Sequence, residues 1–298
     1  MKIYNLKKDK KIDISKIGGK ALPIFEMIKS NFSVPSSFVI DSDFFEQHLK
    51  YINFWQKISI AKMRKTNELK KAQKLIIESH ISRELKDKLS KIKNNIRFWA
   101  VRSSANVEDS KNNSWAGRFE SFIGIKQKDL EQNIKKVWAS VFRAKVISYL
   151  DDLKNIKKIK MSVLLQTAID ADVSGVLFTK DIFKNEENNL VIEAVNGIGE
   201  YLMQGEIIPD KYVVNKKSLV IVEIDFNEQK NKLSFSRKGF LSKSKNINVK
   251  KQKLSGGQII ELSKIAIKNE KIYKTAQDIE WCIKYGRFYL LQSRPITT

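Results

Sequence analysis

The sequence predicts a mixed α/β fold in which short strands alternate with helices. Three observations lead to this prediction. Apolar residues recur at helical spacing from residue 42 to about residue 95, short runs rich in β-branched residues follow, and an apolar hairpin closes the chain. With 298 residues, 42% of them hydrophobic, the chain is long enough to bury a sizeable core.

The first predicted elements are a glycine-led loop, a helix and a strand. The loop starts at Gly18, the helix covers about residues 21–30, and the strand at 36–40 follows Pro35, which marks a boundary. From residue 42 to about residue 95, charged residues separate the apolar positions. We therefore expect a helical region with solvated outer faces.

The middle of the chain begins with a continuous apolar run at residues 98–101, which is typical of a buried strand. The polar residues 102–114 are expected to form a loop behind it, where chemistry often occurs. A helix is expected at about 129–153. Strands at 161–168 and 173–179 follow, and we expect these two to be neighbours in one sheet.

The second half repeats this pattern. Its predicted elements are a strand at 190–194, a glycine-rich connection at 197–205, strands near 211–214 and 218–224, and a helix at about 257–273. Residues 227–253 are poor in large apolar side chains, so we expect exposed, mobile strands and loops there. The closing strands at 277–283 and 287–292 predict a hairpin whose turn uses Tyr285 and Gly286.

Composition bounds the class of protein. The net charge of +23 would attract an anionic partner, but only nine of the 56 basic residues are arginine and the lysines are spread along the whole chain. We therefore expect solvated faces and no nucleic-acid binding. The single cysteine, Cys282, excludes a disulfide within the chain, and no apolar stretch approaches the ~20 residues of a membrane span. A cytoplasmic protein without membrane contact is expected.

Two short segments in the first half could bind phosphate. Gly18-Gly19-Lys20 opens a helix, where backbone N–H groups and an ammonium group favour anions, although a plain loop and helix cap would look the same. Arg102, directly after a buried strand, offers a guanidinium fork beside two serine hydroxyls. A surface salt bridge is the alternative interpretation.

The closing hairpin has a second polar group. Asp278 and Glu280 are two residues apart on one strand, so both carboxylates lie on the same face. Gln292 and Arg294 have the same spacing on the partner strand. If Glu280 lies opposite Gln292, hard oxygens that suit Mg²⁺ and a phosphate-binding arginine lie together. The polar outer face of an amphipathic hairpin is the alternative.

Six segments in order resemble successive parts of one known domain. They are GGKALPIFEMIKSNFSVPSSFVI, FWAVRSSANVEDSKNNSWAGRFESFIGI, VWASVFRAKVISYL, MSVLLQTAIDADVSGVLFTKDI, VIEAVNGIGEYLMQGEIIPDKYVV and QDIEWCIKYGRFYLLQSRPIT. Together they resemble the N-terminal ATP-binding domain of the phosphoenolpyruvate synthase and pyruvate phosphate dikinase family, and also the nucleotide domain of rifampicin phosphotransferases. The resemblance runs from about residue 3 to residue 298.

This resemblance implies an ATP-grasp fold that forms a single nucleotide-binding domain over residues 1–298. Two lobes, at about 1–170 and 171–298, would contain mixed or antiparallel sheets with a nucleotide cleft between them. ATP and Mg²⁺ are the implied cofactors.

The resemblance also implies a role for individual residues. Lys20 and Arg294 would contact the phosphates, and Arg102 would hold the phosphate being cleaved. Gly117 would let the backbone close over the phosphates, Ser121 stands where the family usually has threonine, and Gln166 would reach the adenine. Glu280 and Gln292 would hold Mg²⁺, and Asp278 would support these two residues. Arg102 and Arg294 are the implied catalytic residues.

Some positions depart from the family pattern. Ala21 follows Lys20 where members often have glycine, and Asn106 and Val107 stand in a segment where they often have AT-AED. Arg118 follows Ala116-Gly117 where they often have glutamine. A bulky cation in a phosphate-covering loop could add a phosphate contact or alter the chemistry.

The expected function is ATP cleavage with phosphoryl transfer. Full-length family members pass the group to a histidine on a carrier domain, and then to a small molecule in a third domain. His48 and His80 lack the Gly-Gly-Thr-Ser-His surroundings of that carrier, so we expect both to be structural or surface residues and the phosphate acceptor to belong to a separate protein. Two alternatives stay open: a non-catalytic nucleotide-binding module, and a basic-surface interaction protein with a relic ATP site.

Overall fold

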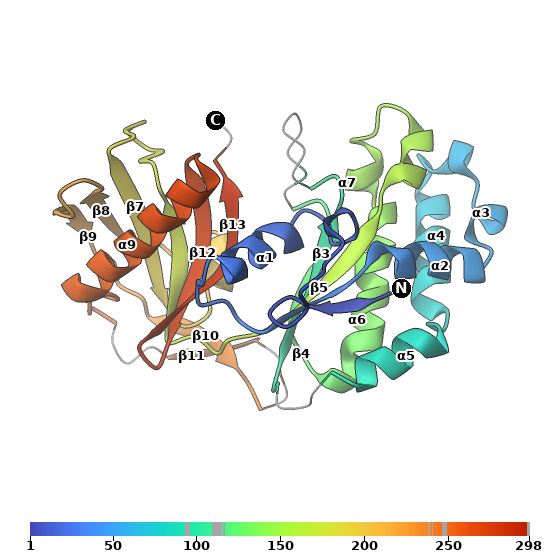
Figure 1. Cartoon of the computed structure of the whole chain (residues 1–298), viewed down its shortest axis with the longest axis horizontal. Coiled ribbons are helices and arrows are strands. Elements are labelled where there is room, and N and C mark those ends of the chain that lie inside the picture. Colours follow the sequence, from blue (N-terminus) through green and yellow to red (C-terminus); the bar gives the residue numbers. More distant parts are fainter. Residues whose placement is uncertain are drawn as a thin grey trace. The chain divides into compact units, whose positions relative to one another are not determined.

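The computed structural model of the chain describes residues 1–92, 96–108, 115, 117–237, 239, 241–245 and 249–296. It contains two compact units (Figure 1). The first unit comprises Met1–Glu26 and Ser36–Ala168, and the second comprises Met27–Pro35 and Ile169–Thr298. Each unit has an antiparallel sheet and helices of its own, so the predicted mixed α/β fold is confirmed.

The first unit is built on a five-stranded sheet with the strand order β1-β2-β5-β3-β4. The strands are β1 (Ile3–Asn5), β2 (Ser37–Ile40), β3 (Trp99–Ala105), β4 (Ser121–Ile125) and β5 (Met161–Thr167). All neighbouring pairs are antiparallel. Because β3 and β5 lie in the middle of the sheet, both of their edges are hydrogen-bonded and most of their side chains are buried.

Helices pack against this sheet and bury its apolar side chains. They are α2 (Ser42–Tyr51), α3 (Phe54–Lys57), α4 (Thr66–Glu78), α5 (Arg83–Ser90), α6 (Leu130–Ala139) and α7 (Ala144–Ile147). Short 3-10 segments lie at Ile14–Lys16, Ile60–Lys62, Gln127–Asp129, Ser140–Phe142 and Leu153–Lys158. One core contains Trp99 and Val101 from the sheet and Phe45 and Trp138 from the helices. Burying each such large apolar side chain stabilises the folded chain by about 1.5–3 kcal/mol.

The second unit is built on a six-stranded sheet with the order β13-β12-β6-β7-β8-β9. Its strands are β6 (Val173–Phe178), β7 (Asn189–Asn196), β8 (Asp210–Asn215), β9 (Ile221–Asp225), β12 (Gln277–Lys284) and β13 (Arg287–Pro295). Strands β10 (Asn231–Phe235) and β11 (Leu241–Lys245) form a separate ribbon. Helix α8 (Glu200–Met203) is short.

Helix α9 (Gly256–Tyr273) packs against β8 and β12 of this sheet. Its N-terminus is fixed by a capping box, in which the Ser255 side chain accepts from the Gln258 N–H and the Gln258 side chain accepts from the Ser255 N–H. Helix α1 (Ala21–Lys29) begins in the first unit and ends in the second.

Most elements lie within a few residues of their predicted positions, and the closing hairpin is confirmed in detail. Tyr285 and Gly286, between β12 and β13, both have positive φ, of 50° and 74°. Two consecutive residues of that kind form the turn that suits the twist of a two-residue hairpin.

Two predictions about strands were wrong. Arg102 to Ala105 do not begin a loop but continue β3, because β5 pairs with this whole segment and the buried Ser103 and Ser104 hydroxyls both find hydrogen-bond partners. Residues 109–114 of the expected loop lie outside the described residues. Strands β5 and β6 are not neighbours, since they belong to different sheets. Strand β4 was not predicted at all.

The helix predicted at 129–153 is broken. Helix α6 ends at Ala139, a 3-10 turn follows, and Arg143 has the extended dihedral angles φ −88° and ψ 149°. The Ser140 hydroxyl bonds back to the Val137 carbonyl at 2.6 Å, a contact that competes with helix continuation.

The expectation that residues 227–253 form exposed strands and loops was correct only in part. The segment forms the short ribbon, but Gln229, Leu233, Phe235 and Lys253 are buried in it.

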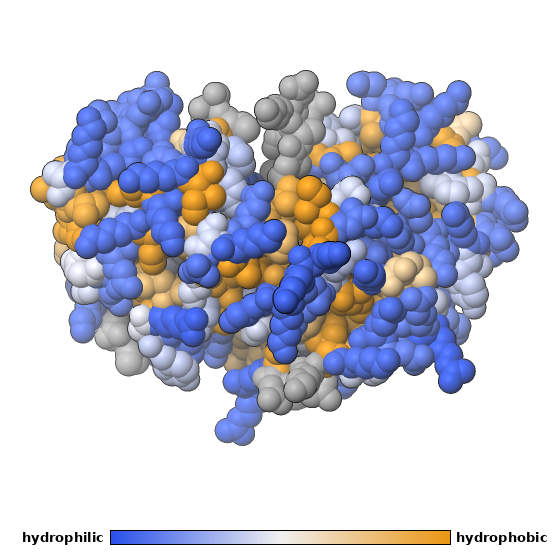
Figure 2. Space-filling view, in the orientation of Figure 1, coloured by the Kyte–Doolittle hydropathy of each residue, from blue (hydrophilic) through white to orange (hydrophobic). Residues whose placement is uncertain are grey.

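No helix in the part of the chain that the structure describes is long and apolar enough to cross a bilayer. Figure 2 shows hydrophilic residues spread over the visible face in many places instead of one compact patch.

Candidate functional site

The glycine loop before α1 is fixed to strand β3. Gly18 has φ +74°, and a Cβ atom at this position would lie 1.9 Å from the Ser104 carbonyl oxygen, so only glycine fits. The Ser104 hydroxyl accepts from the Ala21 N–H at 3.0 Å and donates to the Ile17 carbonyl at 2.7 Å. These contacts hold the backbone at the start of α1 against the sheet, and they fix the position from which Lys20 extends.

Lys20 is engaged by two groups near the end of β3. Its ammonium group donates to the Ser103 hydroxyl at 3.0 Å and forms a close ion pair with Glu108. Glu108 has a side chain only 4% exposed, and it also accepts from the Ser103 hydroxyl at 2.9 Å and from the Ala105 N–H at 2.8 Å. The carboxylate thus orients the lysine, and an anionic ligand would compete for the same ammonium group.

Arg102, Ser121 and Gln166 share one face of the first sheet. Arg102 of β3 lies opposite Ser121 of β4 and Leu164 of β5, and Gln166 of β5 lies opposite Ala100. Since residues directly opposite each other point to the same side, and residues two apart do so as well, all three side chains leave the sheet on the same side. Gln166 is buried, Arg102 is half-buried and Ser121 is exposed.

The loop before β4 contains Gly117 and Arg118. Gly117 has φ +65°, and its carbonyl accepts a close hydrogen bond from the Lys145 ammonium group. The Arg118 guanidinium lies 3.6 Å from the centre of the Tyr149 ring and donates to the Lys145 carbonyl at 3.1 Å. Arg118 is therefore held by groups of its own unit, through a cation–π contact. Ala116, between Trp115 and Gly117, lies outside the described residues.

In the second unit, the β12–β13 hairpin brings the four polar residues opposite each other, with a β-bulge between Glu280 and Trp281. Glu280 lies opposite Gln292, and Asp278 lies opposite Arg294. The Arg294 guanidinium donates to the Asp278 carboxylate through Nε at 2.9 Å and Nη2 at 2.7 Å. The hairpin thus places two hard-oxygen side chains, an amide and a carboxylate, beside an arginine that a second carboxylate orients.

A third carboxylate, Glu193 on β7, belongs to the same sheet face. Val176 of β6 lies opposite both Glu280 and Glu193, which aligns these residues in one row across the sheet. Burial raises the pKa of Glu193, with Lys211 lowering it and Asp278 raising it further. Burial likewise raises the pKa of Asp278 against the opposing effect of Arg294. Bringing a cation to this face would lower both pKa values.

Glu108 and Glu193 had no role among the residues predicted from the sequence. Glu108 could have been noticed as an acidic residue three positions after the end of a strand, where its side chain can bond back to the Ala105 N–H. Glu193 stands in the apolar run of a predicted strand, where a charged residue is unusual. Among the residues that the structure describes, no three His, Cys, Asp or Glu side chains are close enough to hold a metal ion by themselves.

The two histidines differ in environment. His48 is 4% exposed, its Nε2 lies 2.9 Å from the Ser79 hydroxyl, and burial together with nearby Lys135 lowers its pKa to about 4. His80 is exposed. The buried position of His48 agrees with a structural role.

The resemblance found in the sequence can be compared with known families. The model of the pyruvate phosphate dikinase AMP/ATP-binding domain matches residues 14–298. The chain belongs to this family. The family assignment confirms the predicted ATP-grasp class and the predicted ATP-binding domain.

Curated relatives support the assignment. A probable phosphoenolpyruvate synthase of Methanocaldococcus jannaschii is 32% identical over 97% of this chain and 26% of its own length. The phosphotransferase YvkC of Bacillus subtilis is 30% identical over 94% of the chain and 33% of its own length. A rifampicin phosphotransferase of Bacillus subtilis is 28% identical over 99% of the chain and 36% of its own length. The chain thus spans about a quarter to a third of these relatives.

Proposed function

We propose that this chain binds Mg-ATP and is the ATP-cleaving part of a phosphotransferase, with residues 1–298 acting as a single nucleotide-binding domain. The observation that supports this most directly is the β12–β13 register, which pairs Glu280 with Gln292 and Asp278 with Arg294. In a member of an AMP/ATP-binding family, this arrangement provides hard oxygens and a guanidinium group for a metal–phosphate ligand.

The proposed roles follow from the side chains and their positions. Lys20 and Arg294 contact the phosphate chain, Arg102 holds the phosphoryl group that is transferred, the Gly117 backbone and Ser121 approach the phosphates, and Gln166 contacts the adenine. Glu108 forms an ion pair with the Lys20 ammonium group. The phosphates of a bound nucleotide would compete with Glu108 for this ammonium group.

The donor set of the hairpin fits Mg²⁺. Glu280 and Gln292 would supply two oxygen ligands, which is the number that Mg²⁺ usually takes from protein when phosphates and water complete its shell. When bound, Mg²⁺ would neutralise charge on the phosphates. Asp278 holds the Arg294 guanidinium through two hydrogen bonds and so orients it for the phosphate chain.

The reaction needs little covalent chemistry from this chain. A phosphorus–oxygen bond of ATP breaks and a new bond forms to a nucleophile, while the protein positions the groups and neutralises charge. We place the accepting nucleophile, a histidine or another group, on a separate protein. His48 is unsuited because it is buried and hydrogen-bonded to Ser79.

Calorimetric titration with ATP and Mg²⁺, followed by chromatography of the nucleotide, tests the proposal. We expect binding by the isolated chain, and AMP or ADP after a histidine-bearing phosphocarrier protein is added. AMP would show transfer of the β-phosphoryl group and ADP that of the γ-phosphoryl group. Absence of ATP binding would contradict the whole proposal, whereas binding with no turnover in the presence of the carrier would contradict the catalytic part and favour a nucleotide-binding module.

A further inference from the structure

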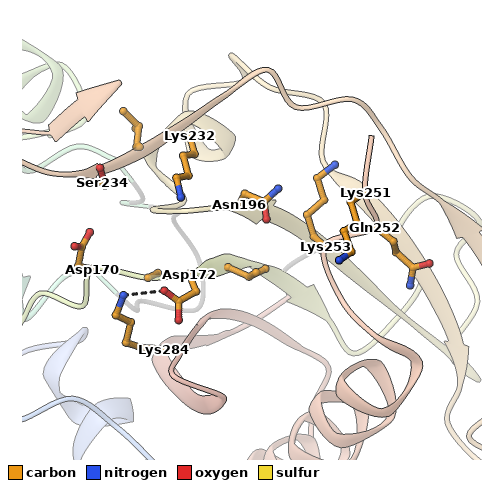
Figure 3. A pocket seen from close by; sticks show the side chains of 12 residues that line it. Asp170, Asp172, Asn196, Lys232, Ser234, Lys251, Gln252, Lys253 and Lys284 are labelled. Atoms are coloured by element: carbon orange, nitrogen blue, oxygen red, sulfur yellow. Dashed lines mark hydrogen bonds and ion pairs between the residues drawn. The ribbon is translucent and has the colours of Figure 1, made fainter. Parts of the chain in front are cut away.

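A polar pocket lies at one end of the six-stranded sheet of the second unit. Its volume is about 390 Å³, within the range of small-molecule sites. Figure 3 shows Lys232, Asn196 and Lys251 along one side of the pocket and Asp170, Asp172 and Lys284 along the other. These residues come from β7, β10, the end of β12 and the segments before β6 and α9.

The ribbon strand β10 closes this pocket and is fixed in place. Gly197 forms a bridge with Leu233, and the Ile198 N–H donates to the Leu233 carbonyl at 2.9 Å. The Phe235 N–H donates to the Asp170 carboxylate at 3.0 Å. A Cβ atom on Gly197 would lie 2.3 Å from the Leu233 carbonyl oxygen, so glycine permits this close approach. The wall that contains Lys232 is therefore part of the packed structure.

The acceptors of the pocket are already used by the protein. The Asp172 carboxylate accepts from the Lys284 ammonium group at 2.7 Å and from the Tyr285 N–H at 2.9 Å. Burial disfavours the charge on Asp172, but these hydrogen bonds outweigh it and lower the pKa, so the residue is ionised. Asp170 accepts from the Phe235 N–H.

The donors, in contrast, exceed the acceptors. Within the described residues, neither Lys232 nor Lys251 forms an ion pair or a side-chain hydrogen bond, and the Asn196 Nδ2 is buried without a hydrogen-bond partner. A buried donor without a partner costs about 1–3 kcal/mol, which a ligand that supplies an acceptor would recover. Lys284 and Asp172 neutralise each other, so Lys232 and Lys251 leave the lining positive even with Asp170 counted.

We propose that this pocket is a binding site for a small anion bearing a phosphate or carboxylate group, held by Lys232, Lys251 and Asn196. Such a group supplies acceptors and negative charge to donors that the carboxylates of Asp170 and Asp172 do not satisfy. Lysine, a flexible point charge, binds either kind of anion.

This site is distinct from the Asp278–Arg294 pair. Lys284 and Asp278 lie six residues apart on the same strand, which corresponds to about 20 Å at 3.3 Å per residue. One bound phosphate group cannot contact both ends. The inference therefore does not depend on the proposed catalytic function.

Calorimetric titration with inorganic phosphate and with citrate, in separate experiments, tests the site on the whole chain. The variant Lys232→Ala/Lys251→Ala should bind the preferred anion at least about tenfold more weakly than the natural sequence. Lys230→Ala is the matched control, because this exposed lysine is two residues from Lys232 and outside the pocket.

A second measurement locates the anion without relying on affinity. Acetylation of lysines, followed by mass spectrometry of peptides, should show Lys232 and Lys251 protected by the anion and Lys230 unprotected. Equal anion affinity in the double variant and the natural sequence, or no binding of either anion at about 10 mM, would overturn the proposal.

Discussion

Asp210 and Lys253 form an ion pair in which both side chains are completely buried. Asp210 also accepts from the Tyr212 hydroxyl at 2.7 Å, the Asn227 N–H at 2.8 Å and the Lys253 N–H at 2.9 Å. The Lys253 ammonium group donates to the Asn227 carbonyl as well. These hydrogen bonds offset the cost of removing both charges from water. The pair therefore joins β8 to the chain on both sides of the β10–β11 ribbon, at Asn227 and at Lys253.

Replacement of Lys253 by methionine should destabilise the chain strongly. The change leaves the Asp210 carboxylate buried without its counter-charge, and breaking a buried pair from one side costs about 3–5 kcal/mol. Urea unfolding measures this loss. Lys250→Met, at a side chain that is 81% exposed, should change the free energy of unfolding by less than about 0.5 kcal/mol. Similar losses in both variants would contradict the role given to the pair.

Gly18→Ala tests the fixed position of the loop before α1. The new Cβ would meet the Ser104 carbonyl oxygen, so we expect a loss of more than about 3 kcal/mol in addition to the backbone strain. Gly286→Ala is a close control, because Gly286 has the same φ of +74° but open space at the Cβ position. That variant should lose only about 1 kcal/mol. Thermal unfolding of the two proteins gives the difference, and equal losses would show that the contact with Ser104 is unimportant.

His48 should make stability depend on pH. Its pKa falls from an ordinary value of 6.5 to about 4 on folding, so the unfolded chain binds a proton more readily between these values. The stabilisation is complete above about pH 6.5 and is lost as pH falls toward 4, by about 3 kcal/mol in total. Urea unfolding at several pH values should show this slope in the natural sequence and in His80→Gln, but a smaller one in His48→Gln. An unchanged slope in His48→Gln would assign the effect to other groups.

The closing hairpin shows what the sequence alone can predict. Its period-two pattern and its Tyr285-Gly286 turn predict the pairing from Lys284 opposite Arg287 to Trp281 opposite Leu290, and the structure has this register. A two-residue turn alone would place Glu280 opposite Leu291. The β-bulge between Glu280 and Trp281 shifts the register so that Glu280 lies opposite Gln292, and turn chemistry does not predict this bulge.

Contacts between distant segments could not be predicted in the same way. Ser103 and Ser104 look like loop residues, but they are strand residues because β5 pairs with them, and Glu108 and Ile17 accept hydrogen bonds from their buried hydroxyls. Glu193 joins the polar row because β6 lies between β7 and β12. Sheet order depends on the whole chain, and single-residue properties contain little of it.

Glu280→Gln should raise the Mg²⁺ concentration needed for ATP binding. The amide keeps an oxygen but loses the charge that favours a hard cation, and we expect a shift of at least about tenfold. ATP titrations at increasing Mg²⁺ concentrations measure it. Asp225→Asn is the control, because Asp225 lies in the same row at the far edge of the sheet. An equal shift in both variants would indicate a general effect of charge instead of metal binding.

Arg294→Ala should weaken ATP binding by at least about tenfold, because a charge-assisted hydrogen bond contributes about 1.5–3 kcal/mol. The change also leaves Asp278 without its partner, which removes an influence that lowers the Asp278 pKa. The unpaired Asp278 carboxylate repels the phosphates, and it takes up a proton as pH falls. The nucleotide affinity of the variant should therefore recover in part at lower pH. Arg287→Ala, on the same strand and bonded to Ser33, should keep both the affinity and its pH profile. Calorimetric titration at two pH values separates the variants, and unchanged affinity in Arg294→Ala would show that this arginine does not contact the nucleotide.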